Sequence, residues 1–173
     1  MNLKFLKFRK KFFWRARMAV RRAKTGDLSR IRDLLGQVLR VHAELRPDLF
    51  SDHAVKYSDE EILSILEDSA TPVFVYENAE GLVCGYVFCV RKEPPARAHL
   101  KPLKTLFIDD FCVEKTCRGK KVGQTLYEYV RAYAKKEGFD RITLNVWNAN
   151  LKAYGFYEAM GLKPLETIME DLL

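Results

Sequence analysis

Apolar and polar residues follow two different periods along the chain, and these periods predict an order of helices and strands. Apolar positions three or four residues apart are typical of helices, and they cover 28–42, 122–137 and 151–160. Shorter apolar runs rich in β-branched and aromatic residues predict strands over 19–23, 73–76, 82–90, 106–113, 142–147 and 165–169. Because helices and strands interleave, the pattern predicts an α/β domain.

Residues at the element ends support this order. Asp27 is placed to cap the first helix, and Ser58 with Glu61 forms a capping box that opens a further short helix. The run 82–90 is apolar almost throughout, so we expect a central strand that is buried on both faces.

Composition narrows the class of protein. The 173 residues are 48% hydrophobic and 31% charged, as in an ordinary globular protein and unlike a disordered chain. No apolar run approaches the roughly 20 residues that span a bilayer. The basic N-terminus lacks the apolar core of a secretory signal, so we predict a cytoplasmic protein.

The formal net charge of +7 is concentrated at one end of the chain. Seven Lys and Arg and no acid lie in residues 1–17, which leaves 23 bases and 23 acids in 18–173. We therefore divide the chain into a basic extension and a neutral domain, and the neutral domain argues against nucleic acid as a partner. Phe5, Phe8 and Phe12 share a helical spacing. The extension is either an amphipathic helix that meets lipid, RNA or a partner, or residues upstream of the domain's own start.

Cysteine and histidine spacing indicates neither a metal site nor a redox motif. The four cysteines form no C-x-x-C pair and the three histidines are scattered. We expect reduced thiols and no metal. The cysteines lie at Cys84, Cys89, Cys112 and Cys117.

A strand that runs into a basic turn and then a helix is the most informative local feature. The free N–H groups and the dipole of a helix N-terminus attract anions. By itself this signal is weak, because lysines at a helix start are usually solvated. The turn lacks the spacing of a Walker A loop and of a dinucleotide-binding loop. Its residues are Arg118, Gly119, Lys120, Lys121, Val122, Gly123 and Gln124.

Three segments together resemble the GNAT superfamily of N-acetyltransferases: V-E-K-T-C-R-G-K-K-V-G at 113–123, Asn150, and F-Y-E-A-M-G-L at 156–162. The resemblance implies a central, mostly antiparallel sheet of six to seven strands flanked by helices. The family's phosphate-loop pattern is Arg/Gln-x-x-Gly-x-Gly/Ala, and here Lys121 replaces the middle glycine. A positive φ at this position would strain a lysine, whereas a helical conformation would not.

The resemblance also implies a site for acetyl-CoA as cosubstrate. The N–H groups of 118–124 would hold the pyrophosphate. Phe111 and Val113 would pair with the pantetheine through their backbones, and an N–H near Cys112 would polarise the thioester carbonyl. Asn150 would contact pantetheine or backbone. Tyr157 would protonate the departing thiolate.

Asp109 and Asp110 are the candidates for the general base that takes a proton from the substrate ammonium. The segment I-D-D-F-C-V is similar to one in polyamine acetyltransferases in which the first acid is the proposed base, which favours Asp109. Alternatively the two acids bind a cationic substrate or cap the strand. Successive strand residues face opposite sides, so we expect one carboxylate in the cleft and one turned away. In ribosomal-protein N-terminal acetyltransferases a Glu on the fifth strand acts as the general base, and Asn145 occupies its position here. This difference weakens an assignment to that group.

The resemblance places the acceptor beside two loops, after the first helix and before the fourth strand. Their candidate contacts are Glu44, Arg46, Asp48, Phe50, Tyr57, Arg97 and His99. We predict an N-acetyltransferase that transfers acetyl from acetyl-CoA to a primary amine (a small amine, an amino acid or a peptide N-terminus) by direct attack, as a monomer or a homodimer. The alternative is a catalytically silent acyl-CoA-binding or RNA-associated module that uses the basic extension.

Overall fold

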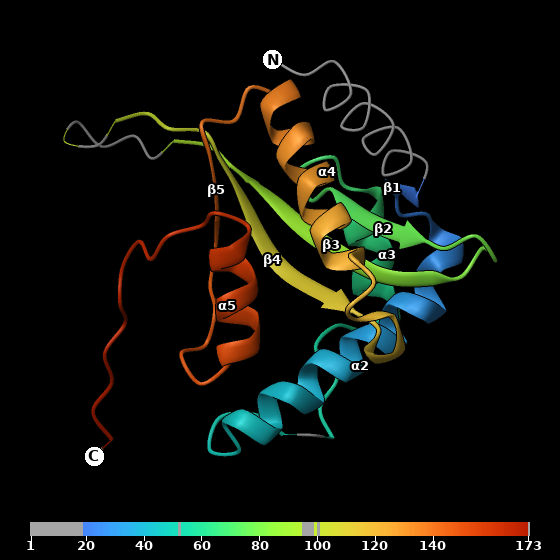
Figure 1. Ribbon diagram of the computed structural model, residues 1–173, viewed down its shortest axis with the longest axis horizontal. Helices are drawn as coiled ribbons and strands as arrows, with labels where there is room; N and C mark the ends of the chain where they lie inside the picture. The colour runs from blue at the N-terminus through green and yellow to red at the C-terminus, as the bar shows by residue number, and fades with distance from the viewer. Residues whose placement is uncertain (1–18, 52, 95–98, 100, 173) are drawn as a thin grey trace, which may run out of the picture.

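A computed structural model describes residues 19–51, 53–94, 99 and 101–172 (Figure 1). The predicted extension 1–17 and Arg97 lie outside these residues, so the predictions made for them stay predictions. Five strands form one sheet in the order β1–β2–β3–β4–β5. The first three pairings are antiparallel and β4–β5 is parallel, which confirms the mostly antiparallel sheet. The strands are β1 (Val20–Arg22), β2 (Val73–Glu77), β3 (Val83–Lys92), β4 (Thr105–Val113) and β5 (Arg141–Leu144).

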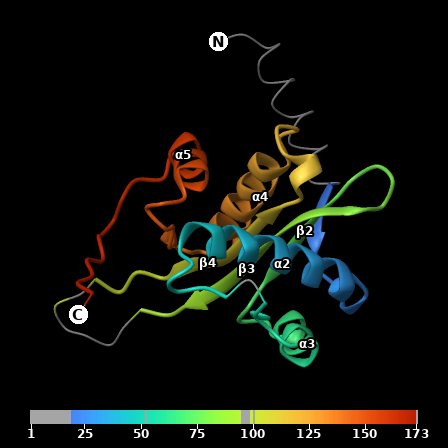
Figure 2. The same ribbon diagram turned by 90° about the horizontal axis from the view of Figure 1, so that it is seen from below.

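Helices cover both faces of the sheet (Figure 2). The apolar stripes of α2 and α3 pack on one face, and that of α4 packs on the other. A further helix, α5, follows β5 and packs partly against the α4 side. The helices are α2 (Leu28–Leu45), α3 (Asp59–Glu67), α4 (Val122–Lys136) and α5 (Leu151–Ala159), with 3₁₀ turns η1 (Thr25–Asp27) and η2 (Lys115–Cys117).

The middle of the sheet is tightly packed around β3, as its apolar sequence predicts. Residues 83–89 are all buried. Gly85 faces Val113 of β4, and a Cβ at Gly85 would lie 2.7 Å from the Cys112 carbonyl oxygen and 3.1 Å from Leu126 Cδ1. This strand therefore tolerates no side chain at Gly85 without movement of β4.

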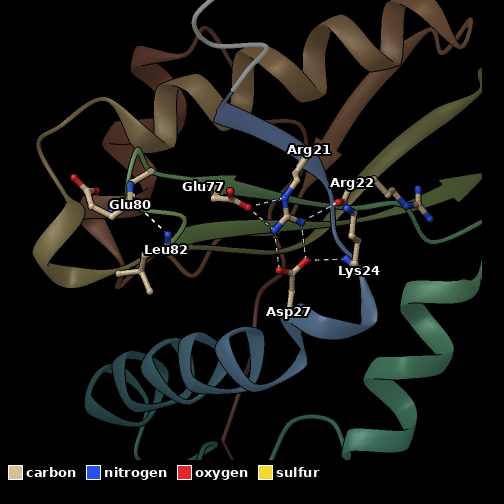
Figure 3. A network of polar contacts seen from close by, with 8 residues as sticks. Arg21, Arg22, Lys24, Asp27, Glu77, Glu80 and Leu82 are labelled. Carbon is tan, nitrogen blue, oxygen red and sulfur yellow. Dashed lines mark hydrogen bonds and ion pairs between the residues drawn. The ribbon is translucent and has the colours of Figure 1, made fainter.

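Arg21 joins the first two strands to the start of α2 (Figure 3). Its guanidinium donates to Glu77 of β2 at 2.8 Å and to both carboxylate oxygens of Asp27 at 2.7 and 2.9 Å. Asp27 also accepts from the Lys24 N–H at 2.8 Å, so its side chain caps η1 and makes no cap bond to α2. The capping box of Ser58 and Glu61 is formed as predicted.

The C-terminal part of the sheet differs from the sequence prediction. The predicted strand 142–147 is the shorter β5, and residues 165–169 form no strand. Their apolar side chains are exposed, because no neighbouring strand among the described residues pairs with them. The described sheet therefore has five strands instead of the expected six to seven.

Candidate active site

Strand β5 lies beside only the first part of β4 (Figure 1). Residues 105–108 pair with 141–144, and the chain leaves the sheet after Leu144. Residues 109–113 of β4 therefore have no partner on the β5 side within the described structure. This backbone edge borders a large open groove that is also lined by the loop before α4 and by α5. The predicted pantetheine contacts Phe111, Cys112 and Val113 lie on this edge.

A β-bulge brings the two candidate bases to the same side of the sheet. Phe88 pairs with Asp110 and Cys89 pairs with Ile108, so Asp109 is an extra residue in β4. Lys56 Nζ lies 3.3 Å from Asp109 Oδ2 and 2.7 Å from Asp110 Oδ2. The expectation that the carboxylates face opposite sides is therefore wrong, since the bulge interrupts the alternation of the strand.

The two carboxylates have different surroundings. Asp110 is 4% exposed and accepts from the Tyr86 hydroxyl at 2.9 Å, whereas Asp109 is 35% exposed and accepts from the Tyr57 hydroxyl at 2.8 Å. Burial raises the pKa of Tyr57 and of Tyr86, with further contributions from the bond to Asp109 and from the charge of Asp110 respectively. Both phenols therefore stay protonated and donate to the carboxylates.

Lys56 completes this cluster and was missed by the sequence analysis. Burial alone would lower the pKa of Lys56, but the carboxylates of Asp110 and Asp109 outweigh it and raise the pKa above its usual value. The cluster thus holds a primary ammonium at neutral pH. Nothing in the sequence marks Lys56, a single lysine in the loop between α2 and α3, as the partner of these two carboxylates.

Tyr157 lies on α5 and packs against the ring of Phe111 on β4, with centroids 6.3 Å apart. Burial, and then the negative charge of Asp110, raise the pKa of Tyr157. The phenol is therefore a protonated donor beside the unpaired edge of β4. Asn150 precedes α5, and its side-chain oxygen accepts from the Ala153 N–H at 3.1 Å, so it caps this helix.

The loop between β4 and α4 presents N–H groups and positive charge to the groove. No side chain caps the N-terminus of α4, which leaves the N–H groups of its first turn, residues 122–124, available to an anion. Arg118 Nε donates to the Val113 carbonyl at 3.0 Å, and the Gln124 amide donates to Glu128 at 2.9 Å. Arg118, Lys120 and Lys121 are exposed. These donors and charges suit a phosphate group.

Two further contacts fix the position of this loop. Glu114 follows β4 and accepts from Arg30 at 2.5 Å and Gln37 at 2.9 Å, both on α2. Gly123 lies against α5, since a Cβ at this position would be 3.3 Å from the Phe156 ring. The absence of a side chain at Gly123 allows α4 and α5 to approach each other.

Lys121 adopts the left-handed conformation, with φ 65° and ψ 9°. It is the one non-glycine residue with positive φ in the described part of the chain. Of the two conformations considered for this position, the strained positive φ is therefore present and the helical one is not. A left-handed conformation costs a non-glycine residue about 1–2 kcal/mol.

Lys121→Gly is expected to raise the free energy of unfolding by about 0.5–1 kcal/mol, because relief of strain exceeds the added entropy of the unfolded chain. Urea unfolding measures the change. Lys120→Gly is the matched control, since it removes the same charge without a left-handed conformation to relieve. Equal or lower stability of Lys121→Gly relative to Lys120→Gly would contradict the strain.

The acceptor-side candidates fall into separate groups. Tyr57 joins the carboxylate cluster. Phe50 lies between His42 and Trp147, with ring centroids at 5.1 and 5.4 Å, and Arg46 lies over the Trp147 ring. Asp48 binds Arg46, whereas Glu44 and His99 are exposed with no role that the structure reveals. The sequence analysis placed Trp147 in the strand 142–147, and so did not predict its contacts with Phe50 and Arg46.

The buried cysteines are poor nucleophiles. Burial raises the pKa of Cys112 to about 12 and of Cys89 to about 12. Burial and the neighbouring Cys117 raise the pKa of Cys84 to about 11. All three are therefore thiols at neutral pH. Among the described residues no group of three His, Cys, Asp or Glu side chains is arranged to hold a metal. No helix in the described ranges is long and apolar enough to cross a bilayer.

A mixed sheet whose β4 and β5 separate beside an uncapped, basic helix N-terminus is the architecture of the acyl-CoA N-acyltransferase fold. The chain belongs to the acetyltransferase (GNAT) family, whose sequence model matches residues 38–162.

Solved structures share this fold. The BH1408 protein of Bacillus halodurans is 25% identical, with a TM-score of 0.85 over 89% of this chain and 99% of that one. An aminoglycoside acetyltransferase from an uncultured soil metagenomic sample is 16% identical, with a TM-score of 0.65 over 89% and 93%. Aminoglycoside N-acetyltransferase AAC(6')-Iy, solved with CoA, gives the same values and, at this identity, shares the fold alone. None of the curated proteins compared with the chain matches it.

Proposed function

We propose that the protein transfers the acetyl group of acetyl-CoA to a primary amine by direct attack. The observation that carries this proposal is the ammonium of Lys56, bound by Asp109 and Asp110 next to the unpaired edge of β4. A site that holds a primary ammonium at this place suits an acceptor amine. Lys56 is 37% exposed and lies on a loop, so an acceptor ammonium can displace it toward solvent.

Acetyl-CoA would lie along the groove. The first-turn N–H groups of α4, with Arg118, Lys120 and Lys121, would bind the pyrophosphate. The unpaired backbone of Phe111 and Cys112 would pair with the pantetheine. The Val113 carbonyl already accepts a hydrogen bond from Arg118. Val113 would therefore pair with the pantetheine through its other backbone groups only. Asn150 would contact the pantetheine through the part of its amide that does not cap α5.

The proposed chemistry needs a base, an oxyanion donor and an acid. Asp109 takes the proton of the acceptor ammonium, directly or through water, because it is the more exposed carboxylate. The amine then attacks the thioester carbonyl, and an N–H near Cys112 stabilises the oxyanion. The C–S bond breaks as Tyr157 donates its proton to the CoA thiolate, and the extra proton on the amide nitrogen then passes, directly or through water, to the Tyr157 phenolate. Asp110, buried and bonded to Tyr86, holds Lys56 or the acceptor in place.

Tyr157→Phe is expected to lower kcat by about 100-fold, the lower end of acid catalysis, with little change in the KM for acetyl-CoA. The phenol acts on the leaving group only, so binding should persist. Steady-state kinetics with varied acetyl-CoA measure both constants. Tyr129→Phe, on the far side of α4 against Phe74, is the control and should behave as the wild type. An unchanged kcat in Tyr157→Phe would remove it as the acid.

A panel of amines tests the function itself. Calorimetry first establishes that acetyl-CoA binds, and release of the CoA thiol is then followed with diamines, aminoglycosides, amino acids and peptides. We expect turnover with a primary amine and none with its N,N-dimethyl form, which has no N–H to lose after attack. Binding of acetyl-CoA without thiol release across the panel would favour the catalytically silent module.

A further inference from the structure

Three aromatic rings pack on one another in the groove that also holds the carboxylate cluster. Phe50 lies in the loop after α2, and its ring centroid is 5.1 Å from that of His42 on α2 and 5.4 Å from that of Trp147 after β5. Both ribbon views show the end of α2 next to the connection from β5 to α5 (Figures 1 and 2). The three rings line the same groove as Asp109 and Asp110.

His42 connects these rings to the carboxylates. Burial lowers the pKa of His42, and the charges of Asp110 and Lys56 act on its imidazole in opposite directions. The imidazole therefore lies within electrostatic reach of the ion cluster and is neutral at neutral pH. A neutral ring adds an aromatic face to the groove and does not repel a cation bound at Asp110.

The rings leave apolar surface accessible from the groove. Trp147 is 37% exposed, and Leu49 is 52% exposed. The Arg46 guanidinium lies over the Trp147 ring, 5.6 Å from its centroid. Asp48 and Glu170 pair with this guanidinium at 2.7 and 2.8 Å, so its charge is already matched within the chain. What the rings offer a ligand is therefore aromatic and apolar contact.

We propose that the acceptor is an arylalkylamine, a primary amine that carries an aromatic ring on a short carbon chain. This inference rests on the proposed function, in which the acceptor ammonium takes the place of Lys56 at Asp109 and Asp110. The ring of the acceptor then packs on Phe50 and Trp147. Aromatic rings bury a large apolar area and contact one another in stacked or edge-to-face pairs. A diamine or an aminoglycoside would instead bring a second ammonium or several hydroxyls to these rings, where such groups lose water for an apolar contact.

Rates of CoA thiol release with matched amines test the acceptor class. We expect kcat/KM for 2-phenylethylamine to exceed that for propylamine, 1,4-diaminobutane and an aminoglycoside by about 10-fold or more, the effect of burying a ring. Benzylamine and 4-phenylbutylamine vary the length of the carbon chain, and the best of the three aryl amines is the one compared. An equal or higher kcat/KM with any comparison amine would overturn the inference and leave acetyl transfer to a primary amine in place. Bound acetyl-CoA without thiol release from any amine would remove the proposed function, and this inference with it.

Variants of the rings separate packing on the acceptor from a general loss of activity. Phe50→Ala and Trp147→Ala should each lower the ratio of kcat/KM for 2-phenylethylamine to kcat/KM for propylamine by about 10-fold. This ratio does not depend on the fraction of the protein that is folded. Leu82→Ala removes an exposed apolar side chain before β3, and this control should keep the wild-type ratio. The wild-type ratio in either ring variant would contradict the proposal.

Fluorescence of Trp147 provides a measurement that needs neither turnover nor a change in the rings. The sequence has two tryptophans, Trp14 and Trp147, so Trp14→Phe leaves Trp147 as the one emitting tryptophan. With CoA bound, 2-phenylethylamine should change this emission, and the change should saturate with concentration because the ring packs on the indole. Emission that stays the same on addition of 2-phenylethylamine would overturn the proposal.

Discussion

Asp109→Asn is expected to lower kcat/KM for the amine by about 100-fold or more near neutral pH, the range typical of a general base. The substitution keeps the shape of the side chain and can still accept from Tyr57, which bonds Asp109 at 2.8 Å. It removes the ability to take a proton. The loss should therefore appear in the proton-transfer step, with the KM for acetyl-CoA nearly unchanged.

The ratio of wild-type to Asp109→Asn rates should fall as the pH rises. At low pH the acceptor is an ammonium and needs the base, so the ratio of wild-type to variant rates should be largest there. As the pH rises toward the amine pKa of about 10, free amine becomes abundant and the ratio should narrow. Asp33→Asn makes the same charge change on the exposed side of α2 and is the control. A ratio that is constant with pH would exclude Asp109 as the base.

Gly85→Ala is expected to destabilise the fold by about 3 kcal/mol, at the upper end of overpacking, and to lower Tm by about 10 °C. The new Cβ would lie 2.7 Å from the Cys112 carbonyl oxygen, a backbone atom that cannot turn aside as a side chain can. The strain would fall on β4 at the segment that borders the groove. Thermal and urea unfolding measure the loss.

Gly36→Ala is the matched control and should shift stability the other way. Gly36 lies within α2, where the new Cβ would approach only the Arg40 guanidinium, at 3.5 Å. Alanine is favoured over glycine in a helix interior by about 1 kcal/mol. A stable Gly85→Ala would contradict the packing described around β3, and destabilisation by Gly36→Ala would contradict the open surroundings described for Gly36.

The body of the fold could be predicted from the sequence because local signals agree with the packing. The capping box at Ser58 precedes α3, and the apolar run at 82–90 forms the buried β3. The prediction failed where a strand needs a partner. Residues 165–169 have the composition of a strand, but composition does not specify a neighbouring edge, and among the described residues they pair with none.

The sequence identified most residues of the candidate site but not how they are arranged. The motif located the loop before α4, yet the left-handed Lys121 depends on backbone packing that spacing does not encode. Asp109 and Asp110 were identified, but their common side depends on the register between β3 and β4. Lys56 is brought to them across 53 residues of chain, so only the folded structure reveals it.

The bulge allows Asp109 to be gained or lost without a change in the pairing of the sheet. Because this residue has no partner in the ladder, its loss would restore regular pairing of β3 and β4 without moving Asp110 from Phe88. A lineage can therefore gain or lose the exposed carboxylate by a single-codon insertion or deletion while the sheet persists. Under the proposed mechanism, relatives with the same fold that lack this residue should be less active.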